Sequence, residues 1–90
     1  MAPVESKSTD LYFSAYLRAI GIALLRADIT VSKEGQRKVM FVFHLSNDDY
    51  NAHKTRYFSG EGYVSALTYC QALRAMKQLI GHAMRETPPA

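Results

Sequence analysis

Residues 23–45 read ALLRADITVSKEGQRKVMFVFHL, and the spacing of the apolar residues in this stretch decides the fold. From residue 23 to residue 31 every second side chain is apolar: Ala23, Leu25, Ala27, Ile29 and Val31. The same period returns further along, on one face of a second run: Val39, Phe41, Phe43 and Leu45. A period of two is typical of half-buried strands, and Gly35 between the runs can adopt the positive φ of a tight turn. The stretch therefore predicts a β-hairpin.

The register of this hairpin follows from matching the two apolar faces. A three-residue loop at 34–36 would place Val31 opposite Val39 and Ile29 opposite Phe41, whereas a loop one residue longer would break the match. The other face of the second strand would carry four residues: Lys38, Met40, Val42 and His44. Two of these four are apolar on a face that should contact water, so we expect either a helix or a partner chain to cover them.

A helix is predicted before the hairpin, over residues 11–20. It is apolar on nearly all sides, as in a central helix. Only two of its residues are polar: Ser14 and Arg18. Ser8 or Thr9 can cap this helix, with Asp10 in its first turn, and Gly21 can end it in a left-handed conformation.

Two further helices are predicted after the hairpin. Ser46 can cap a short helix that ends near residue 58, and two acids in its first turn suit the positive end of the helix dipole: Asp48 and Asp49. Ser65 can cap the longest helix, residues 66–85, which has one wide apolar arc. Cys70 lies in that arc, and we expect it to be a small buried side chain.

The predicted order is α-β-β-α-α, a small two-layer α+β domain in which the antiparallel hairpin packs on the long C-terminal helix. The chain of 90 residues suffices for one hydrophobic core, so we expect a single domain over residues 9–86. Residues 1–8 contain no apolar run and residues 87–90 contain two prolines. Both ends are therefore expected to be flexible.

Composition and spacing argue against several classes of function. Hydrophobic residues make up 48% and charged residues 21%, as in soluble globular chains, and no run approaches the roughly 18 apolar residues of a membrane span. The single cysteine excludes an intrachain disulfide and favours a reducing, cytoplasmic setting. Six candidate metal ligands lack the spacing of a metal site: His44, His53, His82, Cys70, Asp48 and Asp49. Without a nucleophile motif or converging carboxylates, we expect no catalytic residue, no cofactor and no enzyme.

Short motifs and single residues follow one another along the chain: Thr9-Asp10-Leu11-Tyr12, Ala15-Tyr16-Leu17, Gly21, Phe41-Val42-Phe43, Tyr57-Phe58-Ser59-Gly60, Val64 and Ala72-Leu73-Arg74-Ala75-Met76-Lys77. In this order they resemble a family of short, uncharacterised proteins from bacteria and their phages. The resemblance covers roughly residues 8–82, and Ser59 departs from it, because a longer polar residue such as Asn is expected there. The resemblance implies the same order of elements and a phage or mobile-element origin, but no activity.

The exposed arc of the last helix favours nucleic-acid binding. It carries no acid and a group of cationic or polar side chains: Arg74, Lys77, Gln78, His82 and Arg85. Lys54 and Arg56 of the short helix extend the set, and the net charge is +3. Three tyrosines could stack on bases if exposed: Tyr50, Tyr57 and Tyr63. We predict salt-sensitive contact with the nucleic-acid backbone. The alternative for the same cations is a solvated helix face that balances the helix dipole.

A protein partner is the second hypothesis for function. The first helix has more apolar surface than a small core can absorb, and Tyr and Met are enriched at interfaces. The candidate interface residues are Met40, Val42, Tyr12 and Tyr16. They would suit a protein-interaction or inhibitory factor that docks on a larger host or phage complex. A hairpin domain of this size also gains burial by oligomerisation, so we expect a cytoplasmic homodimer without a membrane contact.

Overall fold

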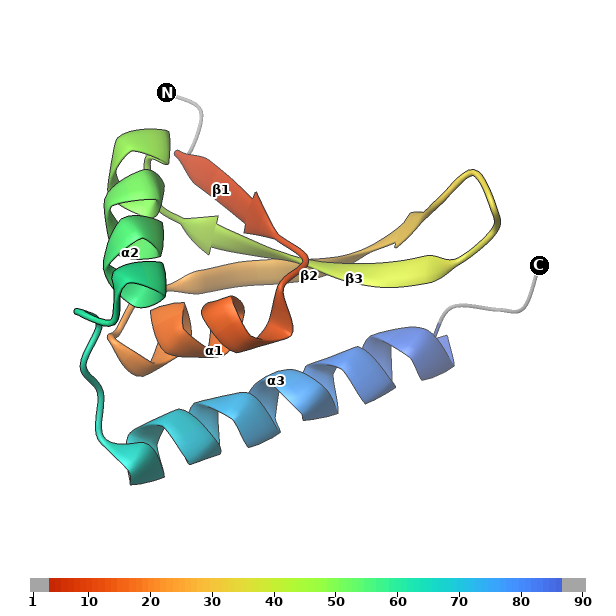
Figure 1. The fold of residues 1–90 in the computed structure, drawn as a ribbon. Coiled ribbons are helices and arrows are strands. Elements are labelled where there is room, and N and C mark those ends of the chain that lie inside the picture. Colours follow the sequence, from red (N-terminus) through yellow and green to blue (C-terminus); the bar gives the residue numbers. More distant parts are fainter. Residues whose placement is uncertain (1–3, 87–90) are drawn as a thin grey trace.

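The computed structural model describes residues 4–86, which form three strands and three helices (Figure 1). In chain order the elements are β1 (Glu5–Ser8), α1 (Leu11–Ala19), β2 (Leu24–Val31), β3 (Arg37–His44), α2 (Asn47–Ser59) and α3 (Ala66–Glu86). The α+β class and the order of the three helices and the hairpin are confirmed. Strand β1 is an addition to the predicted order.

Strand β1 corrects the expectation that residues 1–8 form a flexible end, as far as residues 5–8 are concerned. It pairs with β3 in the antiparallel sense, so the sheet has the order β1-β3-β2 and β3 is its central strand. Ser6 is buried, and its hydroxyl donates a hydrogen bond to the carbonyl oxygen of Leu45 at 2.8 Å. The strand contains no apolar residue, so a search for hydrophobic alternation does not find it. Residues 1–3 and 87–90 lie outside the described part of the chain.

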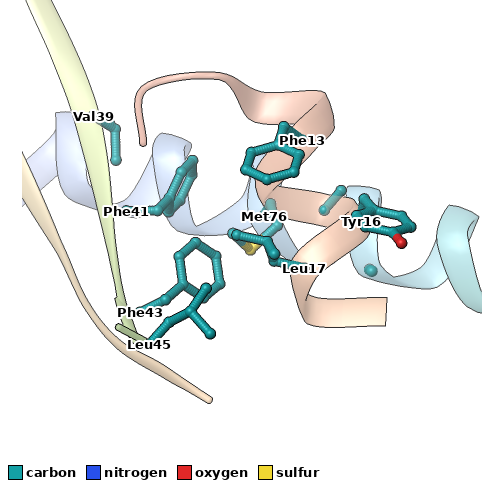
Figure 2. Packing of buried hydrophobic residues seen from close by; sticks show 10 residues of the cluster. Phe13, Tyr16, Leu17, Val39, Phe41, Phe43, Leu45 and Met76 are labelled. Atoms are coloured by element: carbon teal, nitrogen blue, oxygen red, sulfur yellow. The ribbon is translucent and has the colours of Figure 1, made fainter. Parts of the chain in front are cut away.

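The domain has two layers. Helices α1 and α3 lie on the same side of the sheet, and α2 stands across the end at which the chain enters β1 (Figure 1). Side chains of β3 and of the two layer helices meet in the core (Figure 2), which consists of Phe13, Ala15, Tyr16, Leu17, Val39, Phe41, Phe43, Leu45, Ala72 and Met76. Helix α2 adds Tyr50 and Tyr57, whose rings each lie 5.4 Å from the ring of Phe13. The predicted packing of the hairpin on the last helix is therefore present, because α3 contacts β2 directly and also packs against α1.

The hairpin register differs from the predicted one by two residues. Val31 pairs with Arg37 and Ile29 with Val39, instead of Val31 with Val39 and Ile29 with Phe41. The loop does contain three residues, but they are 33–35, closed by a hydrogen bond from Ser32 N to Gln36 O at 2.8 Å. A three-residue loop needs a left-handed residue in its last position, and Gly35 fills it with φ of 82°. The preference of glycine for that position therefore decides the register. Because the shift is of two residues, the apolar faces still match, with Ile29 opposite Val39 and Ala27 opposite Phe41.

A β-bulge between Leu24 and Arg26 corrects the predicted inner face of β2. Leu25, expected to face the core, is exposed, and Leu24 packs against the core instead. An extra residue in one strand shifts the alternation of faces by one position, which reverses the expected pattern at the start of β2.

The helix ends follow local capping chemistry. Asp10 is the N-cap of α1, in place of Ser8 or Thr9, because its carboxylate accepts hydrogen bonds from the backbone N–H groups of Tyr12 and Phe13. The predicted caps Ser46 and Ser65 are confirmed by hydrogen bonds from Asp49 N and Thr68 N, at 3.1 Å each. The predicted stop after α1 is also confirmed, with Gly21 at φ of 95°.

The expectation of a buried Cys70 is wrong, because the thiol side chain is exposed. The strip of α3 that packs against α1 is narrower than the apolar arc of the sequence, with only Ala72 and Met76 fully buried in it. Cys70 lies on the flank of that strip, beside Leu73 and Arg74.

Candidate nucleic-acid interface

The predicted binding residues of α3 all lie on its exposed side: Arg74, Lys77, Gln78, His82 and Arg85. Most of this side faces solvent, because Ala72 and Met76 hold the opposite side in the core, and one flank of it borders α1. The segment from Arg74 to Arg85 extends over about 16 Å at the rise of an α-helix. We call these five residues the α3 basic face.

Arg18 of α1 joins the α3 basic face, although sequence analysis did not select it. It lines a shallow depression of about 540 Å³ between α1 and α3, together with Ala75, Gln78, Leu79, His82 and Arg85. We call this hollow the α1–α3 depression. In the sequence, Arg18 stands out only as the one charged residue of an otherwise largely apolar helix. Its proximity to Arg85 depends on how the two helices pack, which no local pattern reveals.

The arginine and lysine side chains of this surface form no ion pair with a side chain that the structure describes. Within residues 4–86, none of the side chains of Arg18, Arg74, Lys77 and Arg85 forms an ion pair. Arg26 on the sheet differs, because it binds Glu5 at 3.0 Å and Asp28 at 3.1 Å. Between Ala66 and Arg85 the helix carries no Asp or Glu, and its one acid, Glu86, is its last residue, so the charged side chains of the α3 basic face are all cationic. Such a surface attracts anions.

A second, smaller hollow of about 210 Å³ lies further towards the start of α3, lined by Cys70, Leu73, Arg74 and Lys77. Two exposed side chains precede the α3 basic face in the sequence, those of Tyr63, before α3, and Leu67, in its first turn. Tyr63 is 87% exposed, whereas Tyr50 and Tyr57 are half-buried in ring contacts with Phe13. Of the three tyrosines considered for stacking, Tyr63 is therefore the one that is free to do so.

Lys54 and Arg56 lie on a different surface from the α3 basic face. Both are exposed on α2, which stands at the end of the domain away from the C-terminal half of α3 (Figure 1). The Lys54 ammonium lies 5.9 Å from the centre of the Tyr50 ring, a cation–π contact within its own helix. The seven predicted residues thus form two groups, of five and two.

The four predicted interface residues have different surroundings. Val42 is fully buried and Tyr16 is 3% exposed, so neither presents surface to a partner, whereas Tyr12 is 55% exposed and Met40 is half-buried. Val42 is buried because β1 makes β3 a central strand, with Lys7 and Arg26 as its cross-strand neighbours. The choice left open above, a covering helix or a partner chain, is thereby answered for Val42 by neighbouring strands of its own sheet.

Electrostatic interactions hold this outer face of the sheet together. The guanidinium of Arg26 donates to both carboxylate oxygens of Glu5, at 3.0 and 3.3 Å, and reaches from β2 to β1. These hydrogen bonds lower the pKa of Glu5 and raise the pKa of Arg26. The outer face is therefore internally charge-balanced, unlike the α3 basic face.

A tyrosine hydroxyl connects the start of α1 to α3. Tyr69 donates a hydrogen bond to the backbone carbonyl oxygen of Tyr12 at 3.2 Å. Burial raises the pKa of Tyr69 to about 12, with smaller contributions from the Tyr57 hydroxyl and from Asp10. This contact helps to fix α3 relative to α1, and with it the two sides of the α1–α3 depression.

Residues 4–86 contain no group of three or more His, Cys, Asp and Glu side chains arranged to hold a metal ion. In the same range, none of the helices combines the length and the apolar character that crossing a membrane requires.

Comparisons of the chain with models of protein families, with curated proteins and with solved structures find no match. The resemblance to short bacterial and phage proteins stays a prediction from the sequence.

Proposed function

We propose that the protein binds nucleic acid by contacting the phosphate backbone with the α3 basic face, assisted by Arg18. The observation that carries the proposal is a surface shared by two helices on which Arg18, Arg74, Lys77 and Arg85 are exposed and without ion pairs within residues 4–86. Phosphate contacts from Arg and Lys supply most of the affinity of non-specific nucleic-acid binding. Tyr63, exposed in the connection between α2 and α3, offers a stacking surface for an unpaired base.

The proposal fixes an expected dependence of affinity on salt. Four neutralised phosphates give a slope of log K against log salt of about −3.6 for duplex and about −2.8 for single strands. Over a fourfold rise in salt, from roughly 50 to 200 mM, the affinity should fall about 150-fold for duplex and about 50-fold for a single strand.

Fluorescence anisotropy with labelled single-stranded and duplex oligonucleotides tests the proposal. The variant Arg74→Gln/Lys77→Gln should bind more weakly, with a duplex slope reduced by about 1.8. The matched control is Lys54→Gln/Arg56→Gln, which removes the same charge from α2 and should leave the slope unchanged. Equal effects of both pairs would show that only net charge matters and would overturn the proposal. Absence of binding to either oligonucleotide at low salt would overturn it as well.

A second candidate function is docking on a larger protein complex, and one observation favours it. Exposed apolar side chains follow one another where α2 ends and α3 begins: Phe58, Tyr63 and Leu67. Exposed aromatic groups are common anchors of protein interfaces. Binding of this kind should persist at a salt concentration that abolishes oligonucleotide binding, and it should fail in Phe58→Ser. The same salt series therefore separates the two functions.

We also propose that the chain acts as a cytoplasmic homodimer, joined through the free edge of β2. This strand has β3 on one side and no paired strand on its other side among residues 4–86. Counting alternate residues from the hydrogen-bonded pair Ser32 and Gln36, the N–H of Ala27 points away from β3. Ala27→Pro should therefore block strand addition while keeping the internal sheet bonds. A single-chain mass of the wild type in light scattering would overturn the dimer. The reducing cytoplasm would also keep the exposed thiol of Cys70 free.

A further inference from the structure

The α1–α3 depression brings together side chains from two helices that the sequence separates widely. Arg18 comes from the last turn of α1, whereas Gln78, His82 and Arg85 come from the C-terminal half of α3. Ala75 and Leu79 supply the apolar part of its lining. With a volume of about 540 Å³, the hollow has room for a phosphate group and part of the nucleotide that carries it.

The two backbones that form this hollow are held in fixed positions. Leu17, the residue before Arg18, is fully buried, and so is Met76, the residue after Ala75. Both belong to the core, together with Phe43 of β3 (Figure 2). Near Arg85, Ala83 and Met84 also pack against the core. The backbone on both sides of the hollow is therefore held, and little backbone entropy is lost when a ligand binds there.

The chemistry of the lining selects an anion with several acceptor oxygens. Two guanidinium groups offer planar forks of donors that match phosphate oxygens in pairs, and the Gln78 amide adds a neutral donor. Among the described residues, the lining contains no carboxylate to compete for these donors or to repel a ligand. Charge-assisted hydrogen bonds are about twice as strong as neutral ones, and the adjoining apolar side chains reduce screening by water.

We propose that the α1–α3 depression is a seat for one phosphate group, held between Arg18 and Arg85. This inference rests on the proposed function only for the source of the phosphate, which we assign to a nucleic-acid strand running along α3. Free phosphate and mononucleotides share the same chemistry and are distinguished by the test.

NMR titration of backbone amides with inorganic phosphate tests the seat directly. At constant ionic strength, phosphate should shift amides around residues 18, 75–79 and 82–85 in a saturable manner, and chloride should not. Arg18→Gln should weaken phosphate and oligonucleotide binding about tenfold or more, because it removes charge-assisted bonds. Arg85→Gln provides a second, independent variant with the same expected loss.

Arg56→Gln is the matched control, because Arg56 is also an exposed arginine in the last turn of a helix. If Arg18 only balanced the dipole of its helix, both variants would change stability alike and neither would change phosphate binding, which would overturn the seat. Shifts scattered over the whole surface would overturn it too.

The same titrations separate the seat from the proposed function. Oligonucleotide binding that survives Arg18→Gln and Arg85→Gln at full strength would overturn the seat and leave the α3 basic face in place. Saturable binding of phosphate or a mononucleotide without oligonucleotide binding would support the seat, overturn the proposed function, and assign the phosphate to a free source.

Discussion

Gly62 lies against the ring of Tyr16, and its replacement by alanine tests how closely the connection between α2 and α3 packs on α1. A Cβ on Gly62 would lie 2.8 Å from the Tyr16 hydroxyl oxygen and 2.9 Å from Cε1 and Cζ. Carbon atoms in comfortable contact are about 3.5–4.0 Å apart. The ring has no free space into which it could turn, because Tyr16 is 3% exposed and its ring centre lies 5.2 Å from that of Tyr57.

The magnitude follows from two opposing effects. Overpacking of this kind destabilises the folded state by about 1–3 kcal/mol. Alanine also has fewer conformations than glycine in the unfolded chain, which stabilises the folded state by about 0.4–1 kcal/mol. We expect Gly62→Ala to lower the free energy of unfolding by about 1–2 kcal/mol, which lowers Tm by about 5–15 °C in a domain of this size. Gly81→Ala is the control, since its Cβ would meet nothing within 4 Å in the middle of α3. It should stabilise the chain by about 0.5–1 kcal/mol.

Thermal and urea unfolding followed by circular dichroism measure both effects. The double variant Gly62→Ala/Tyr16→Phe removes the nearest atom but leaves the two ring carbons at 2.9 Å, so it should relieve only part of the strain. A rise in stability for Gly62→Ala similar to that of Gly81→Ala would refute the reasoning, because it would mean that the Tyr16 ring yields without cost.

Four further predictions follow from named side chains. The pKa of Glu5 is lower in the folded chain than its ordinary value of 4.5. The stability that the ionised Glu5 contributes is therefore complete above pH 4.5 and is lost as the pH falls through the folded pKa. Glu5→Gln should weaken this loss of stability at acid pH, as measured by urea unfolding at several pH values. The pKa of Tyr69 is raised from 10.0 to about 12. The stability that the neutral hydroxyl contributes is therefore complete below pH 10 and is lost as the pH rises to the folded pKa. Tyr69→Phe should remove this loss of stability at alkaline pH, as measured by unfolding curves and by the absorbance of tyrosinate. Ser14 is fully buried with a hydroxyl that has no partner within residues 4–86, so Ser14→Ala should leave stability unchanged or raise it by about 1 kcal/mol, and a clear loss in urea unfolding would contradict this. Cys70 should react fully with a thiol reagent without denaturant, and protection until unfolding would contradict its exposure.

The burial of Val42 shows how one unpredicted strand changes the interpretation of a surface. Sequence analysis assigned Met40 and Val42 to a face that needs a cover, and a partner chain was one candidate. Strand β1 makes β3 central, and the ion pairs of Arg26 with Glu5 and Asp28 then run over this face. The apolar surface that suggested an interface is thus largely used within the domain, whereas the α3 basic face is not.

Short-range signals were sufficient for most of the fold. The hairpin follows from period-two alternation. The starts of α2 and α3 follow from the N-caps Ser46 and Ser65, and the end of α1 follows from Gly21. Each of these signals is carried by residues within about one helical turn or one strand of each other, so the local physics acts before any tertiary contact forms. The acid-free exposed face of α3 was likewise visible, because helical periodicity alone places its cations together.

Long-range packing decided the remainder. Pairing of β1 with β3 joins residues about forty positions apart through backbone hydrogen bonds, which leave little trace in side-chain pattern. The bulge between Leu24 and Arg26 adds one residue to β2 and so changes which side chains face the core. The alternation of apolar residues in the sequence does not reveal this extra residue. Arg18 and Arg85 line the same hollow only because α1 and α3 pack together, with Leu17 and Met76 buried in one core. The candidate phosphate seat therefore depends on how α1 packs on α3, since the two sides of a hollow between helices exist only once those helices are in contact.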